Sequence, residues 1–325
     1  MTEDLSSLAD RLVPAGRRPG VALGFVDIDG TFTTVVRPGR LPFDEATFFE
    51  IGSLGKTMTA TLLAVLALDG TVALDTTVGD LLGSAAGPAG DVRLEELATH
   101  TSGMPRILQS PGRVFRHARD PYRGYDADAL LADLATATLT DRGTAAYSNA
   151  GFDLLAHCLA VAADQPFARL LEERVLRPAG MLTARCQPCT DAGLAKGRGS
   201  RLIGGHRWHS LLAGAGGVDA TISDAVAWAR ANLLPTSTPL EAAIRLAHEP
   251  RADLSDRHRI GLAWNVQDDA RFHNGGTGRF SSYLVLEPAV GAVVVLENQA
   301  PTIRRADRTS LAAVNDWFLA RVAAA

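Results

Sequence analysis

Residues 48–67 read FFEIGSLGKTMTATLLAVLA, and this stretch predicts both a central helix and a reactive site. Its LLAVLAL portion is apolar on every face, which predicts a buried helix over residues 53–69 that ends at Gly70. Gly-Lys-Thr at 55–57 is also how a phosphate-binding loop ends, whereas Ser53 and Lys56 form a Ser-x-x-Lys motif. The two interpretations predict different chemistry, nucleotide binding or serine acyl transfer.

The phosphate-loop interpretation fails at Glu50. A complete loop needs glycine at this position, and a carboxylate there would repel a phosphate. The preceding segment, residues 43–51, is too polar and too short for the buried strand that leads into such a loop. We therefore disfavour nucleotide binding.

The Ser-x-x-Lys interpretation has a geometric basis. Residues i and i+3 of a helix lie on one face, so Lys56 is within reach of Ser53 as a base. At a helix start, backbone N–H groups and the helix dipole favour developing negative charge. A free lysine has a pKa of about 10.4, so burial or neighbouring groups must lower it. Alone, the motif equally fits a capping serine followed by a surface lysine.

The use of lysine supports a special role for Lys56. Of the 32 basic side chains, 30 are arginine, and Lys196 is the other lysine. A guanidinium does not lose its proton in proteins, whereas an ammonium can. A lysine kept amid this bias predicts a site that needs a proton to leave.

Two further segments could supply partners. AYSNAG (146–151) places Tyr147 and Asn149 in a turn before a predicted helix. RFHNGGTGRFSSYLVLEP (271–288) is a glycine-rich edge that runs into a strand, where glycines often mark the approach of a ligand. The alternatives are a capping asparagine beside a packed tyrosine, and a structural His273.

Together these motifs resemble the serine β-lactamase and penicillin-binding-protein superfamily, in its branch of class C β-lactamases, DD-peptidases and family VIII esterases. SLGK, YSN and HNG occur in the family's order and at suitable separations. Further similarity lies in LATHTSGMP (97–105), AGGVDATISD (215–224) and IGLAW (260–264). The similarity extends from about residue 20 to residue 300.

The resemblance implies a role for each matching residue. Ser53 would be the nucleophile and Lys56 its activating neighbour. Tyr147 would carry the proton to the leaving group and later activate the incoming water or acceptor. Asn149 would hydrogen-bond Lys56 and a substrate amide, and His273 would replace the more usual lysine.

The resemblance also implies an oxyanion hole and shows two departures. The hole would consist of the backbone N–H groups of Ser53 and Gly276. Asn274 stands where threonine is common, so an amide replaces a hydroxyl that helps to recognise a substrate carboxylate. Arg279 stands where glycine is usual, and would crowd the strand or bind an acidic substrate group. Both departures disfavour β-lactam hydrolysis as the natural reaction.

The pattern of elements predicts an α+β fold of the β-lactamase/transpeptidase-like type. Strands at both termini would form one antiparallel sheet flanked by helices, with a helical insertion between them. We expect a sheet domain from residues 1–75 and 251–325, an all-helical domain over 76–250, and the active site in the cleft between them. The expected strands are 20–28, 31–36, 260–266, 281–288 and 291–298, and the closing helix is 303–322.

Composition excludes several functional classes. The net charge of −4 comes without a cluster of Lys and Arg, so we expect no nucleic-acid partner. No run approaches the roughly 18 apolar residues of a membrane span. There is no stretch of signal-peptide length, and three cysteines do not make a disulfide framework, so we expect a cytoplasmic protein. The sequence does not predict the oligomeric state.

Four residues could in principle bind zinc: Cys186, Cys189, His206 and His209. Their spacing is not standard, the segment reads as a loop, and the resembling family needs no metal. We therefore predict two free thiols, no metal and no cofactor.

The predicted function is a serine acyl-enzyme hydrolase acting on a small ester, amide or D-amino-acid peptide. The alternative is a transacylase that transfers an acyl group without ATP to an amine or alcohol in natural-product biosynthesis. A β-lactamase or a non-catalytic binding protein is less expected. A cytoplasmic location disfavours cell-wall and resistance enzymes, which act outside the membrane.

Overall fold

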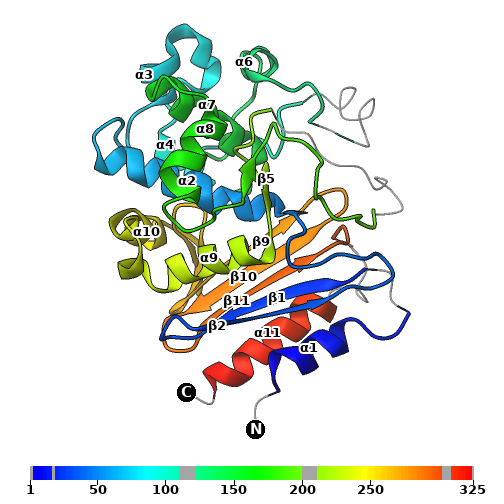
Figure 1. Ribbon diagram of the computed structural model, residues 1–325. Coiled ribbons are helices and arrows are strands. Elements are labelled where there is room, and N and C mark those ends of the chain that lie inside the picture. The colour runs from blue at the N-terminus through cyan, green and yellow to red at the C-terminus, as the bar shows by residue number, and fades with distance from the viewer. Residues whose placement is uncertain are drawn as a thin grey trace.

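The computed structural model describes residues 3–16, 19–109, 120, 122–199, 211–301 and 309–323 (Figure 1). Within these residues, no helix is long and apolar enough to cross a membrane.

An eight-stranded antiparallel sheet joins the two ends of the chain, in the order β2-β1-β11-β10-β9-β8-β7-β6. Val21 in the first strand pairs with Glu297 in the last. The strands are β1 (Val21–Val26), β2 (Phe32–Arg37), β6 (Ala252–Ser255), β7 (His258–Ile260), β8 (Asn265–Gln267), β9 (Ala270–Gly276), β10 (Ser281–Glu287) and β11 (Gly291–Glu297).

The central strands β1 and β11 are apolar on both faces because helices cover both sides of the sheet. Val21 and Leu23 face a core formed with α1 (Leu5–Leu12) and α11 (Thr309–Val322), whereas Ala22 and Val26 face the main core. Figure 1 shows α1 and α11 side by side on one face, with α9 (Ile222–Leu233) on the other.

The other α-helices among the described residues lie on the α9 side of the sheet (Figure 1). They are α2 (Gly55–Leu68), α3 (Val78–Leu82), α4 (Leu94–Ala98), α6 (Ala127–Leu134), α7 (Asn149–Ala162), α8 (Phe167–Leu171) and α10 (Glu241–His248). Although α9 belongs to the segment assigned to the insertion, it packs directly against β1 and β11. The domain boundaries stay a prediction.

Helix α2 is the buried centre of the molecule, as its apolar sequence predicts. A 3-10 turn at Gly52–Leu54 precedes it, so the helix proper begins two residues after Ser53. A small sheet of β3 (Phe49–Glu50), β5 (Val218–Ala220) and β4 (Arg185–Cys186) leads into this turn. Ser282 on β10 donates a hydrogen bond to the Ile51 carbonyl (2.6 Å), which ties the turn to the large sheet.

The structure confirms the α+β class and the antiparallel sheet but corrects one predicted strand. Residues 260–266 are not continuous, because β7 ends at Ile260 and β8 begins at Asn265. Between them Ala263 has a φ of 65°, in the left-handed region. The segment is apolar because it is a buried turn, in which Trp264 is fully enclosed. Residues 303–308 of the predicted closing helix lie outside the described residues.

Candidate active site

The turn that carries Ser53 packs closely against strand β9. Gly52 has a φ of +54°, and a Cβ there would lie 2.6 Å from the backbone nitrogen of Gly276. On its other side, a Cβ on Gly216 would lie 2.5 Å from the Gly52 carbonyl oxygen. Three backbone segments therefore meet around Ser53 at distances that only glycine permits.

Lys56 is fully buried and donates three hydrogen bonds. Its Nζ reaches Ser53 Oγ at 3.0 Å, Asn149 Oδ1 at 2.8 Å and the Ala215 carbonyl at 2.5 Å. An ammonium has three N–H donors, which match these three acceptors. A neutral amine has only two N–H groups. Because an amide oxygen and a carbonyl can only accept, its lone pair would have to face the Ser53 hydroxyl.

Asn149 is held from both ends. Its Oδ1 accepts from Lys56, and its Nδ2 donates to the Tyr122 hydroxyl at 3.1 Å. Asn149 is the first residue of α7, and Ser148 caps the helix by accepting from the Gly151 N–H at 2.9 Å. The cap is therefore Ser148, which leaves the Asn149 side chain free to contact Lys56.

Tyr147 contacts Lys56 with its ring. The Lys56 Nζ lies 5.0 Å from the ring centroid, and the Arg106 guanidinium carbon lies 5.1 Å from it. Tyr147 is 37% exposed, and its hydroxyl makes no hydrogen bond to another described residue. The structure brings Tyr147 to the site, and its role as a proton carrier stays a prediction.

His100 supports the same cluster and was not predicted from the sequence. Its ring lies 4.6 Å from the Tyr147 ring, and its Nδ1 accepts from the Ser148 N–H at 3.2 Å. Burial, together with the charge of Lys56, holds the pKa of His100 well below its usual range. The ring is therefore neutral and carries its proton on Nε2.

His273 lies on β9 and is buried, with Nδ1 2.8 Å from the Asn274 carbonyl. Burial and the nearby charge of Lys56 lower its pKa to about 3. A neutral His273 cannot supply the positive charge of the lysine that it replaces. Asn274 is exposed, and Arg279 packs against Gly197, where a Cβ would lie 2.5 Å from the Arg279 Cβ.

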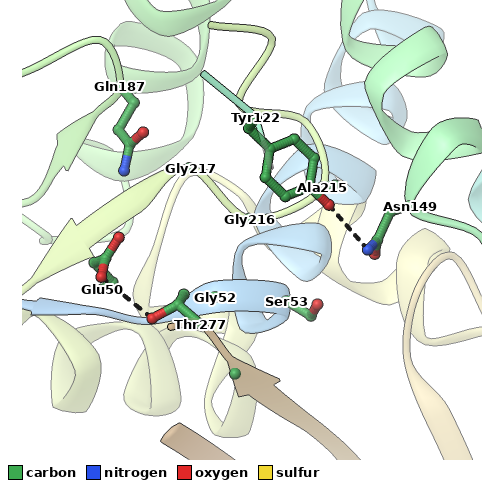
Figure 2. A pocket seen from close by; sticks show the side chains of 11 residues that line it. Glu50, Gly52, Ser53, Tyr122, Asn149, Gln187, Ala215, Gly216, Gly217 and Thr277 are labelled. Atoms are coloured by element: carbon green, nitrogen blue, oxygen red, sulfur yellow. Dashed lines mark hydrogen bonds between the residues drawn. The ribbon is translucent and has the colours of Figure 1, made fainter. Parts of the chain in front are cut away.

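A small pocket opens beside Ser53 (Figure 2). Of the predicted site residues, Ser53, Asn149 and Gly276 line it. The other predicted residues, which are Lys56, Tyr147, His273, Asn274 and Arg279, are not part of its lining. The full lining is Glu50, Gly52, Ser53, Tyr122, Asn149, Gln187, Ala215, Gly216, Gly217, Gly276 and Thr277.

Four polar side chains of the lining were not predicted as site residues: Glu50, Tyr122, Gln187 and Thr277. Figure 2 shows Glu50 accepting from the Thr277 hydroxyl, a bond of 3.2 Å. Tyr122 is one of only four tyrosines, which is the signal that could have drawn attention to it. Gln187 lies between Cys186 and Cys189 of the C-x-x-C sequence and does not itself belong to a recognised motif.

The described residues contain no group of three or more His, Cys, Asp or Glu side chains placed to hold a metal. Cys186 is a buried free thiol whose pKa is raised by burial, and Cys189 donates to Asp219 Oδ2 at 3.3 Å. His206 and His209 lie outside the described residues.

A sequence model of the Beta-lactamase family matches residues 5–315. The chain belongs to the beta-lactamase family. The predicted membership of the serine β-lactamase and penicillin-binding-protein superfamily is thereby confirmed, and the family is one of serine hydrolases.

Two relatives of this beta-lactamase-family chain match different shares of its length. The D-alanyl-D-alanine-carboxypeptidase/endopeptidase AmpH of Escherichia coli (strain K12) is 35% identical over 191 residues, which are 55% of this chain and 47% of that protein. A Beta-lactamase of Pseudomonas fluorescens is 26% identical over 279 residues, 81% of this chain and 70% of that protein. The chain spans about half the length of AmpH.

Solved structures show the same fold. A class C beta lactamase from Rhodobacter sphaeroides has a TM-score of 0.82 with 21% identity over 98% of both chains. A beta-lactamase from Sulfitobacter sp. EE-36 has a TM-score of 0.80 with 21% identity over 98% of this chain and 97% of the other. The predicted β-lactamase-like fold is therefore confirmed.

The neutral state of His273 in this beta-lactamase-family site can be tested directly. The ring resonances should not shift between pH 8 and pH 5, because a pKa of about 3 leaves the ring uncharged throughout this range. NMR of histidine-labelled protein would measure this, with His273→Gln assigning the signal. A titration midpoint above pH 5 would contradict the prediction.

Proposed function

We propose that this chain is a serine hydrolase that forms an acyl-enzyme on Ser53 with small esters or amides. The observation that carries the proposal is the hydrogen bonding of Lys56. Two fixed acceptors, Asn149 and the Ala215 carbonyl, occupy two of its donors and leave the third position for Ser53 Oγ. In its neutral form Lys56 is thus oriented to accept the serine proton.

The proposed reaction has two halves. Ser53 Oγ bonds to the substrate carbonyl carbon while its proton passes to Lys56, and the oxyanion faces the backbone N–H groups of Ser53 and Gly276. The leaving alcohol or amine takes a proton from Lys56 directly or through Tyr147. Water then attacks the acyl carbon and gives up a proton by the same route. The acid departs and Ser53 regains its hydrogen.

The cavity favours substrates without a carboxylate beside the scissile bond. His273 is neutral, and the lining described above contains neither Lys nor Arg. Glu50 places a carboxyl group in the lining, which disfavours an anionic substrate. These features support ester or neutral amide hydrolysis over the D-alanyl-D-alanine and β-lactam activities named for the relatives.

Trapping the intermediate tests the proposal. After incubation with p-nitrophenyl acetate, intact-protein mass spectrometry should show one added acetyl group, located on Ser53 by peptide mapping. Ser53→Ala should show none under the same conditions. An adduct of equal yield on Ser53→Ala, or a wild-type adduct on another residue, would refute the assignment of the nucleophile.

Product analysis separates hydrolysis from the transacylase alternative. With p-nitrophenyl acetate alone the expected product is acetate, and added primary amines should leave it the main product. Predominant amide formation at millimolar amine would instead identify a transacylase, and turnover of neither kind would identify a binding protein.

The three free thiols agree with a reducing compartment, so we propose a cytoplasmic location.

A further inference from the structure

The side chain of Asp153 interacts electrostatically with Lys56 and has no part in the reaction described so far. Asp153 is on α7, four residues after Asn149, so the two side chains share one face of the helix. It is 2% exposed, and its Oδ1 accepts from the Ala215 N–H at 3.1 Å. The same peptide segment offers the Ala215 carbonyl to Lys56.

Helix α7 thus supports Lys56 twice, through Asn149 directly and through Asp153 by way of Ala215. The segment at 213–217 packs tightly against this helix, because a Cβ on Gly214 would lie 2.2 Å from the Phe152 carbonyl. Thr59 of α2 donates to the Gly214 carbonyl at 2.9 Å. The Ala215 peptide is therefore fixed between the two helices, and Asp153 provides its side-chain anchor.

The charges of the two buried groups are complementary. A carboxylate without an opposite charge is costly in the interior, and burial raises the pKa of Asp153 to about 7 despite the opposing effects of Lys56 and the Ala215 N–H. The other ionisable groups around the pair are Tyr122, Tyr147, Arg106, His100 and His273. Both histidines have lowered pKa values and are neutral near pH 7, and burial raises the pKa of Tyr122.

We propose that Asp153 is a positioning residue for Lys56. It holds the Ala215 carbonyl on Nζ, and its carboxylate stabilises the ammonium that forms when Ser53 gives its proton to Lys56. This inference rests on the proposed function. Only the ionised form of Asp153 offers the stabilising charge, so acylation should speed up as the carboxyl ionises.

Neutral substitutions separate the charge from the hydrogen bond. Asp153→Asn keeps an oxygen that can accept from the Ala215 N–H but carries no charge. For wild type, kcat/KM for p-nitrophenyl acetate should rise through about pH 7, where Asp153 ionises. In Asp153→Asn this rise should disappear, and kcat/KM at pH 8.5 should fall about tenfold, which corresponds to about 1.4 kcal/mol of transition-state stabilisation. Asp153→Ser, with a hydroxyl as acceptor, is a second neutral variant should the first not fold.

Asp224→Asn is the matched control. Asp224 is 4% exposed and accepts from the Thr183 and Thr221 N–H groups in the cap of α9, at 3.0 Å each. It should lower the melting temperature and leave the pH profile unchanged. A wild-type profile in a folded Asp153→Asn or Asp153→Ser, or a wild-type enzyme without the rise near pH 7, overturns the inference while Ser53 stays the nucleophile. Full activity in Ser53→Ala would instead overturn the proposed function itself.

Discussion

Lys56→Arg should lower kcat/KM for p-nitrophenyl acetate by about 10³-fold, nearly as far as Lys56→Ala, since general-base catalysis contributes roughly 10²–10⁴. The guanidinium keeps a positive charge but does not give up its proton, so it cannot accept one from Ser53. Lys56 is also fully buried, which leaves a larger head group without room. Steady-state kinetics at pH 8 would measure the loss.

The other lysine provides the control for this experiment. Lys196 is exposed, and its backbone carbonyl accepts from Asn298, an interaction that a side-chain substitution preserves. Lys196→Arg should therefore have wild-type kinetics. If a folded Lys56→Arg enzyme kept most of its activity, then positive charge and not proton exchange would be what the site requires, and Lys56 would not be the base.

Gly52→Ala should reduce kcat by at least about 100-fold, the usual effect of losing one oxyanion-hole donor. The new Cβ would lie 2.6 Å from the Gly276 nitrogen, and its neighbours there are backbone atoms that cannot rotate away. The turn and β9 must move apart, which separates the two N–H groups of the proposed oxyanion hole. The substitution also places alanine at a φ of +54°. We expect a stability loss of about 1–3 kcal/mol.

Gly70→Ala isolates the effect of backbone strain. Gly70 has a φ of +81°, but nothing lies within 4 Å of the position of a Cβ. This variant should lose about 1 kcal/mol of stability and retain wild-type kinetics. Denaturant unfolding and kcat for both variants would complete the comparison. A Gly52→Ala enzyme that loses stability but not activity would show that this backbone contact does not shape the catalytic geometry.

Local sequence signals predicted most elements of the fold. The buried helix expected over residues 53–69 is observed as Gly55–Leu68, because its run of apolar residues ends just before Gly70. The IGLAWNV segment was predicted wrongly because a buried turn and a buried strand are equally apolar. The left-handed conformation of Ala263 marks this segment as a turn, and nothing in the sequence indicates that this alanine adopts it.

The sequence predicted those site residues whose side chains belong to known motifs. It did not predict the contacts and protonation states that depend on tertiary packing. Lys56 is hydrogen-bonded to Ser53, as the i, i+3 spacing predicted, and to Asn149, as the family resemblance implied. Ala215 acts through its backbone carbonyl, which every residue possesses, so its identity carries no signal. The neutrality of His273 comes from its burial, and only the folded chain shows it.

The pairing of β1 with β11 sets when this protein can become active during its synthesis. Val21 has its strand partner at Glu297, and Gly276 reaches the Ser53 turn from the same late segment. A nascent chain that has already made Ser53, Lys56 and Asn149 still lacks both a closed sheet and the second half of the proposed oxyanion hole. Chains released before β9 and β11 are made should therefore lack acyl-transfer activity, because the sheet cannot close without these strands.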